Sequence, residues 1–79
     1  MTWEEQTPEQ RARVRQCVHR ALRRLGSGQT AAAVRVEARA SNGFRDLTLD
    51  YVVAALVELH ESGAVERKDG KTQTVWRIT

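Results

Sequence analysis

The pattern of hydrophobic and polar residues is clearest over residues 48–63, where apolar side chains recur at the three- and four-residue spacing of an α-helix. Thr48 is the expected N-cap, since its hydroxyl can accept a hydrogen bond from a backbone N–H of the first turn. Gly63 is the expected stop, since glycine readily takes the left-handed conformation that follows many helices. The pattern predicts a core-facing helix over residues 48–62. Its expected buried face consists of Leu49, Val52, Val53, Leu56, Val57 and Leu59.

A longer helix is predicted near the start of the chain. Thr7, Pro8 and Gln10 have the spacing of a capping box with proline at the first helical position. Apolar residues then recur at helical spacing, which predicts a helix over residues 8–25 that ends before Gly26. Its expected core positions are Val14, Cys17, Val18, Ala21, Leu22 and Leu25.

The segments on either side of this helix carry weaker signals. Residues 30–40 are rich in alanine, the best helix former, and Thr30 stands where an N-cap is needed, so a second, shorter helix is predicted. A break is expected at residues 41–43. Residues 1–6 should form a short tail, disordered or loosely docked, with Trp3 as its anchor.

After Gly63 the spacing of apolar residues changes from helical to alternating, which predicts two strands. Asp69-Gly70 is a strong signal for a two-residue hairpin turn between them. The cross-strand pairs that this turn implies are Lys68 with Lys71, Arg67 with Thr72, and Val65 with Thr74. Alternation assigns Val65, Trp76 and Ile78 to an apolar face, and Glu66, Lys68, Val75 and Arg77 to the opposite face. The predicted fold is therefore α+β, with three helices followed by a hairpin, in one domain over residues 7–79.

Charge is distributed unevenly along the chain. Six arginines and no acid lie between Arg11 and Arg24, whereas five acids and no Lys or Arg lie between Asp46 and Glu66. Residues 67–77 are basic again. The net charge of +3 permits nucleic-acid binding without requiring it.

Composition points to a small intracellular protein. An apolar content of 41% suffices for a core in 79 residues, and no apolar run approaches the roughly 20 residues that span a bilayer. The acidic N-terminus does not resemble a signal peptide, and Cys17 has no second cysteine with which to form an internal disulfide. A cytoplasmic protein without a membrane span is expected.

The sequence contains no motif for catalysis or cofactor binding. Glycine-rich nucleotide loops and the His-Glu-x-x-His zinc motif are missing, so no enzyme activity, cofactor or metal is expected. Cys17, His19 and His60 do not have the spacing of a zinc site. Cys17 is interpreted as a core residue, His19 as a solvated surface residue, and His60 as a residue at the core rim that hydrogen-bonds a carbonyl.

The order of elements and three short stretches resemble the winged helix-turn-helix superfamily, which includes many small bacterial transcription regulators. One stretch is Gln29-Thr30-Ala31 with Val34, and another is the closing Trp76-Arg77-Ile78-Thr79. The third joins the last helix to the hairpin and comprises Leu56, Leu59, Ser62, Gly63, Val65, Glu66 and Arg67. The resemblance covers most of residues 8–79.

This resemblance implies double-stranded DNA as a partner and transcription regulation as a function. Helix 48–62 would enter the major groove and residues 66–73, the wing, would contact the backbone. The outer face of the helix would include Asp50, Tyr51, Ala54, Ala55 and Glu58. The residues that would contact DNA are Arg35, Arg39, Arg45, Thr48, Tyr51, Ala55, Arg67, Lys68 and Lys71.

An alternative function stays open, because helix 48–62 carries Asp50, Glu58 and Glu61, which phosphates repel. The same fold can serve as a protein-interaction or dimerisation module without binding DNA. Its acidic helix would then meet a basic partner. The arginine-rich helix 8–25 would meet an acidic partner, such as a second copy of the chain in a homodimer.

Overall fold

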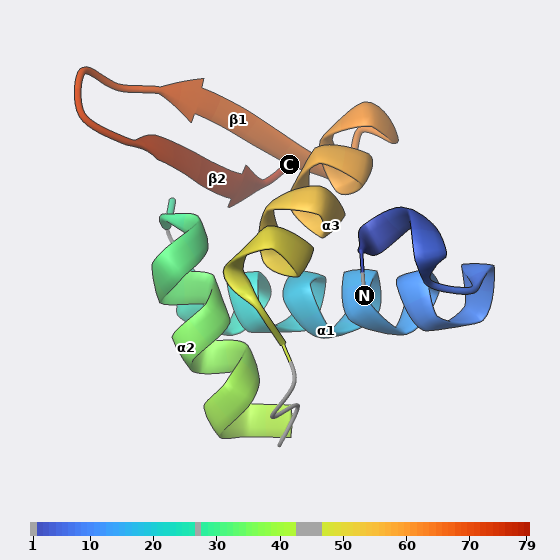
Figure 1. Ribbon diagram of the computed structural model, residues 1–79. Coiled ribbons are helices and arrows are strands. Elements are labelled where there is room, and N and C mark those ends of the chain that lie inside the picture. The colour runs from blue at the N-terminus through green and yellow to red at the C-terminus, as the bar shows by residue number, and fades with distance from the viewer. Residues whose placement is uncertain (1, 27, 43–46) are drawn as a thin grey trace.

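The structure is a computed structural model that describes residues 2–26, 28–42 and 47–79. Helix α1 lies behind α2 and α3, and the hairpin extends over the N-terminal end of α2 (Figure 1). This arrangement confirms the predicted α+β class, with three helices followed by an antiparallel hairpin. The elements are the 3-10 turn η1 (Trp3–Glu5), the helices α1 (Pro8–Leu25), α2 (Ala31–Asn42) and α3 (Leu49–Glu61), and the strands β1 (Val65–Asp69) and β2 (Thr74–Ile78).

Each of the three helices starts at the threonine that the sequence predicts. The Thr7 hydroxyl accepts a hydrogen bond from the Gln10 backbone N–H at 3.1 Å, and the Gln10 side chain accepts one from the Thr7 N–H at 3.0 Å, which completes a capping box. Thr30 and Thr48 each accept a bond from a backbone N–H three residues on, both at 3.2 Å. These bonds satisfy donors that a helix start leaves unpaired.

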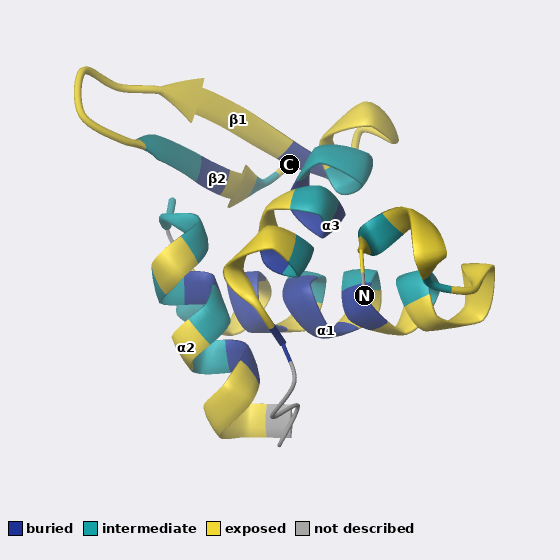
Figure 2. Ribbon diagram, in the orientation of Figure 1, coloured by how far each residue is buried: buried dark blue, intermediate teal, exposed yellow. Residues whose placement is uncertain are grey.

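The core lies where the three helices and one face of the hairpin meet (Figure 2). Five of the six expected residues of α1 are buried, and Leu25 is half-buried against them. Helix α2 contributes Val34 and Ala38, and the hairpin contributes Val65 and Trp76. The buried residues are Val14, Cys17, Val18, Ala21, Leu22, Val34, Ala38, Leu47, Val52, Ala55, Leu56, Val65 and Trp76.

Helix α3 is rotated about its axis relative to the expected orientation. Val52 and Leu56 are buried as predicted, but Leu49 and Val53 are 43% and 38% exposed. Ala55, which was expected on the outer face, is fully buried. The apolar arc of α3 covers about 160° at 100° per residue, wider than one neighbouring element can cover. Packing against α1, α2, β1 and η1 decides which part of this arc is buried.

The predicted two-residue turn is wrong, although the predicted faces are right. Val65 pairs with Ile78 and Asp69 pairs with Thr74, so the loop comprises residues 70–73 and the register differs by four residues. A shift by an even number keeps every side chain on its face, and Val65 and Trp76 are accordingly buried. Asp69 Oδ1 accepts a hydrogen bond from the Thr74 hydroxyl at 2.8 Å, which closes the ladder before Gly70.

The connection between α1 and α2 adds a short third partner to the hairpin. Gln29 forms an antiparallel bridge with Trp76. The backbone nitrogen of Gln29 lies 2.9 Å from the Trp76 carbonyl oxygen, and that of Trp76 lies 2.8 Å from the Gln29 carbonyl oxygen. This bridge fixes where β2 lies relative to the connection between α1 and α2. Because burial of Val65 likewise holds β1 against the core, the two strands pair in the observed register.

The N-terminal tail is docked on α3 through Trp3, the expected anchor. The Trp3 indole N–H donates to a Glu58 carboxylate oxygen, and the Trp3 and Tyr51 rings lie 6.0 Å apart between centroids. The Gln6 side chain donates to the Tyr51 hydroxyl at 3.1 Å. Residues 3–6 are thus docked against α3.

Candidate interaction surface

The N-terminal turn changes which side of α3 faces solvent. Tyr51 is half-buried under Trp3, and Glu58 is held by Trp3 and by Arg15, whose Nη1 lies 2.8 Å from Glu58 Oε1. Both residues were expected on the outer face. The exposed side instead carries Leu49, Asp50, Val53, His60 and Glu61.

Ala55 must be removed from the set of residues expected to contact DNA. Its exposed fraction is 0%, because it packs into the core. A methyl group without solvent exposure cannot reach a base edge in the major groove. The residue at the corresponding place on the real outer face is Val53, which sequence reasoning assigned to the core. The signal that could have found it is the excessive width of the apolar arc.

Thr48 and the two arginines of α2 have different environments. Thr48 is exposed, but its hydroxyl already caps α3. Arg35 is half-buried, and its Nε donates to the Leu47 carbonyl at 3.0 Å, which ties α2 to the start of α3. Arg39 is exposed. Arg45 lies outside the described residues.

The three cations expected in the wing lie on the hairpin, where all are exposed. The Arg67 guanidinium lies 5.5 Å from the centroid of the Trp76 ring, within the range of a cation–π contact, and its Nε donates to Asp69 at 3.1 Å. The hydrogen bond from Thr74, followed by that from Arg67, holds the pKa of Asp69 below its usual value. Lys68 and Lys71 are exposed at the end of the hairpin.

A groove of about 440 Å³ lies between α2, α3 and the hairpin. We call it the α3 groove. Val53 and Val57 line it from α3, and Trp76 lines it from β2. The remaining lining residues come from the start of α2 and from the hairpin: Thr30, Ala31, Ala32, Arg67, Gln73 and Thr74. It brings together Arg67, an expected site residue, with apolar residues that were not expected in a site.

His60 and Cys17, which were considered as metal ligands, take part in packing and hydrogen bonding within the fold. His60 Nδ1 lies 3.1 Å from the Val65 carbonyl oxygen, and its ring meets the Trp76 ring edge-on, as expected for the core rim. Cys17 is buried in the core, as predicted. Within the described part of the chain, no group of three or more His, Cys, Asp or Glu residues is placed to hold a metal ion. None of the described helices combines the length and apolar character needed to span a bilayer.

Comparison of the chain with protein-family models, with curated proteins and with solved structures gives no match.

Proposed function

We propose that this chain is a protein-interaction module of the winged helix type, which binds an apolar segment of a partner protein in the α3 groove. The observation that carries the proposal is the exposure of an aliphatic side chain in an apolar groove, because Val53 lines the groove and is 38% exposed. Two further aliphatic side chains outside the lining are also exposed, Leu49 on α3 at 43% and Val36 on α2 at 69%.

The make-up of the groove fits a protein ligand. Val53, Val57 and Trp76 offer an apolar centre, while Gln73 and Thr74 provide polar groups. An apolar centre with a polar rim is typical of protein–protein interfaces, in which arginine and tryptophan are enriched. Arg67, which lies over Trp76, is placed to contribute both apolar contact and a charge-assisted hydrogen bond.

The charges of α3 also favour a protein over DNA at this face. The exposed side of the helix carries Asp50 and Glu61, and the helix contains no Lys or Arg. A carboxylate facing DNA phosphates is repelled, and direct base recognition relies mainly on Arg, Lys, Asn and Gln side chains. Burial of exposed aliphatic side chains against an apolar partner favours binding, because it removes apolar surface from water.

Peptide selection followed by NMR mapping would test the proposal. Peptides selected from a random library on the wild-type protein should carry apolar anchors and should shift the backbone amide signals of Ala32, Val53, Val57 and Thr74. Val53→Lys should abolish binding of these peptides without unfolding the protein, because Val53 is exposed. Arg13→Lys, on α1, serves as a control that should bind normally. Selected peptides that map to a different face would contradict the proposal.

DNA binding is a second candidate, supported by exposed cations on the hairpin and on α2. Lys68 and Lys71 lie at the end of the hairpin, and Arg39 is exposed on α2. Phosphate contacts need only positive charge and provide most of non-specific affinity. In this case the hairpin, as the wing, would contribute more than α3, and a role in transcription regulation would follow.

A symmetric homodimer through helix α1 is disfavoured by charge. Arg13, Arg20, Arg23 and Arg24 are exposed on this helix. A two-fold contact through the same patch brings like charges together. A second copy would bind more favourably by placing an acidic surface against α1.

A further inference from the structure

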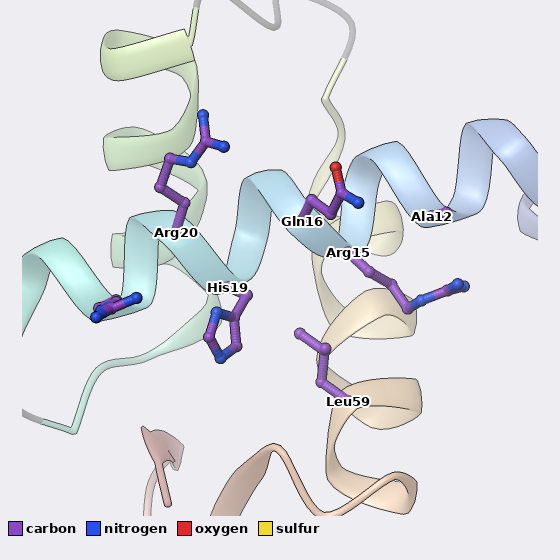
Figure 3. Close-up of a pocket in the computed structure, with 7 residues that line it drawn as sticks. Ala12, Arg15, Gln16, His19, Arg20 and Leu59 are labelled. Atoms are coloured by element: carbon purple, nitrogen blue, oxygen red, sulfur yellow. The ribbon is translucent and has the colours of Figure 1, made fainter.

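A second groove, of about 450 Å³, lies along α1, beside Leu59 of α3 (Figure 3). We call it the α1 groove. Six of its seven lining residues come from α1, and Leu59 comes from α3. The lining residues are Ala12, Arg15, Gln16, His19, Arg20, Arg23 and Leu59. This groove shares no lining residue with the α3 groove.

The lining of the α1 groove is basic and contains no acid. Arg15 is already paired with Glu58 at 2.8 Å. Arg20 and Arg23 make no ion pair or hydrogen bond with any residue that the structure describes, and both are exposed. By contrast, Arg24, outside the groove, lies 3.8 Å from Glu37. The two unpaired guanidinium groups are one helical turn apart, so both can be reached by one ligand.

The groove also has an apolar part. Leu59 and Ala12 are half-buried, and Leu59 packs against the core while its side chain points toward α1 (Figure 3). The phosphate backbone of a nucleic acid gains no binding free energy from contact with an aliphatic side chain, whereas an apolar peptide side chain does. Guanidinium groups pair with carboxylates in a bidentate manner, which gives geometric specificity as well as energy.

From this combination we infer that the α1 groove binds an acidic amphipathic segment of a partner protein. Carboxylates one turn apart on the ligand pair with Arg20 and Arg23. An aliphatic side chain of the ligand lies on Leu59. The α1 groove is a site distinct from the α3 groove, because the two have no lining residue in common.

The probe is a fluorescein-labelled helical peptide of about 16 residues, long enough to populate a helix, with two glutamates one turn apart beside a leucine stripe. Its affinity for the full chain is measured by anisotropy. Arg20→Glu with Arg23→Glu should weaken binding about tenfold or more. The matched control is Arg13→Glu with Arg39→Glu, which makes the same change in net charge at exposed positions outside the groove and should alter affinity by less than about threefold. Circular dichroism checks that both double variants are folded.

Two altered peptides complete the test. Replacing the glutamates by glutamine, or the leucines by serine, should each weaken binding to the wild-type protein. Equal losses in the two double variants would overturn the inference, because they would show unspecific charge attraction. Peptide binding that is indifferent to leucine, together with tighter binding of duplex DNA lost in Arg20→Glu/Arg23→Glu, would assign the groove to phosphates instead. A dimer seen by sedimentation and lost only in that double variant would assign it to a second copy and also overturn the inference.

Discussion

Trp76 connects three parts of the molecule that are distant in sequence. It is 4% exposed, its backbone bridges to Gln29, and its ring meets His60 edge-on and Arg67 over its face. The Trp76 side chain thereby holds the hairpin to the end of α3, and its backbone holds the hairpin to the connection between α1 and α2. It also lines the α3 groove, so stability and proposed function depend on the same residue.

Trp76→Ala is expected to lower the free energy of unfolding by about 3–5 kcal/mol, since large aromatic truncations in a core remove both burial and packing. Urea denaturation followed by circular dichroism measures the change. Val36→Ala is the control, because Val36 is 69% exposed and its change should stay within about 0.5 kcal/mol. A denaturation midpoint that hardly moves in Trp76→Ala would contradict the observed packing of β2.

The contacts of Asp69 affect the pKa of its carboxyl group. The hydrogen bond from Thr74 lowers the pKa of this carboxyl from its usual value near 3.8, with Arg67 adding to the effect. The ionised form therefore contributes stability that is complete above the unfolded-state value and is lost as the pH falls through the lowered pKa. Thr74→Val should raise the pKa of Asp69 toward the usual value, as measured by NMR titration of the carboxyl carbon. Arg67→Gln should raise it less, and an unchanged pKa in Thr74→Val would contradict the observed loop.

Among the elements, the hairpin depends on contacts outside itself. It has only two strands, and an isolated two-stranded hairpin is marginally stable in water. Its stability comes from the bridge at Gln29 and from burial of Val65 and Trp76. Gly28 precedes this bridge and leaves room for Val75, because a Cβ atom added there would lie 2.5 Å from Val75 Cγ1.

Gly28→Ala should therefore destabilise the protein by about 1–3 kcal/mol, as overpacking commonly does. Adding Val75→Ala should recover part of the loss, because it removes the methyl group that the new Cβ would meet. The coupling is measured by urea denaturation of the two single variants and the double variant. Strictly additive effects would show that this close approach does not limit stability.

The N-terminal turn η1 is the other element whose role depends on packing. Its 3-10 hydrogen bonds, including the one from the Gln6 N–H to the Trp3 carbonyl at 3.1 Å, hold Trp3 over Tyr51 and Glu58. Trp3→Ala should release the turn, at a cost of about 1–2 kcal/mol for a half-buried aromatic contact and a hydrogen bond to a charged group. Hydrogen exchange should become faster at the Gln6 amide. Unchanged exchange would indicate that residues 3–6 are held by other contacts, and Glu4→Gln, in the same turn, is a control for altered charge.

On the scale of the whole molecule, exposed basic residues occur on more than one side. The hairpin carries Lys68 and Lys71, and α1 carries Arg20 and Arg23 along a separate groove. Helix α3 carries the exposed acids Asp50 and Glu61. The net charge of +3 is therefore the sum of basic and acidic surfaces on different elements.

Anisotropy titration of a labelled random-sequence duplex of about 25 base pairs at several salt concentrations tests the DNA candidate directly, because the slope of log affinity against log salt counts phosphate contacts. If the hairpin contacts the backbone, Lys68→Ala and Lys71→Ala should each weaken binding evenly across sequences and reduce the slope by about one. Loss of binding only in Arg20→Glu/Arg23→Glu would move the phosphate contacts to α1. No binding even at low salt would leave the protein-interaction function alone.

Local sequence signals were sufficient for the order of the helices and strands and for the start of each helix. However, α2 runs to Asn42, into the break expected at residues 41–43, and the strands end farther from each other than the predicted turn requires. Capping depends on residues three apart, so Thr7, Thr30 and Thr48 mark helix starts without reference to the rest of the fold. Alternation along a strand likewise assigned the faces of the hairpin correctly. The order of these elements predicted the α+β class, because amphipathic helices and a one-sided hairpin must share one core.

The tertiary structure alone decided the hairpin register and the exposed side of α3. Asp69-Gly70 is compatible with a tight turn, but Gln29 and the core select a register four residues away. The apolar arc of α3 is too wide to say which part is covered, and packing against α1, α2, β1 and the N-terminal turn left Ala55 buried and Val53 exposed. These choices depend on contacts between residues distant in sequence, which no local pattern encodes. They also determine which residues can meet a partner.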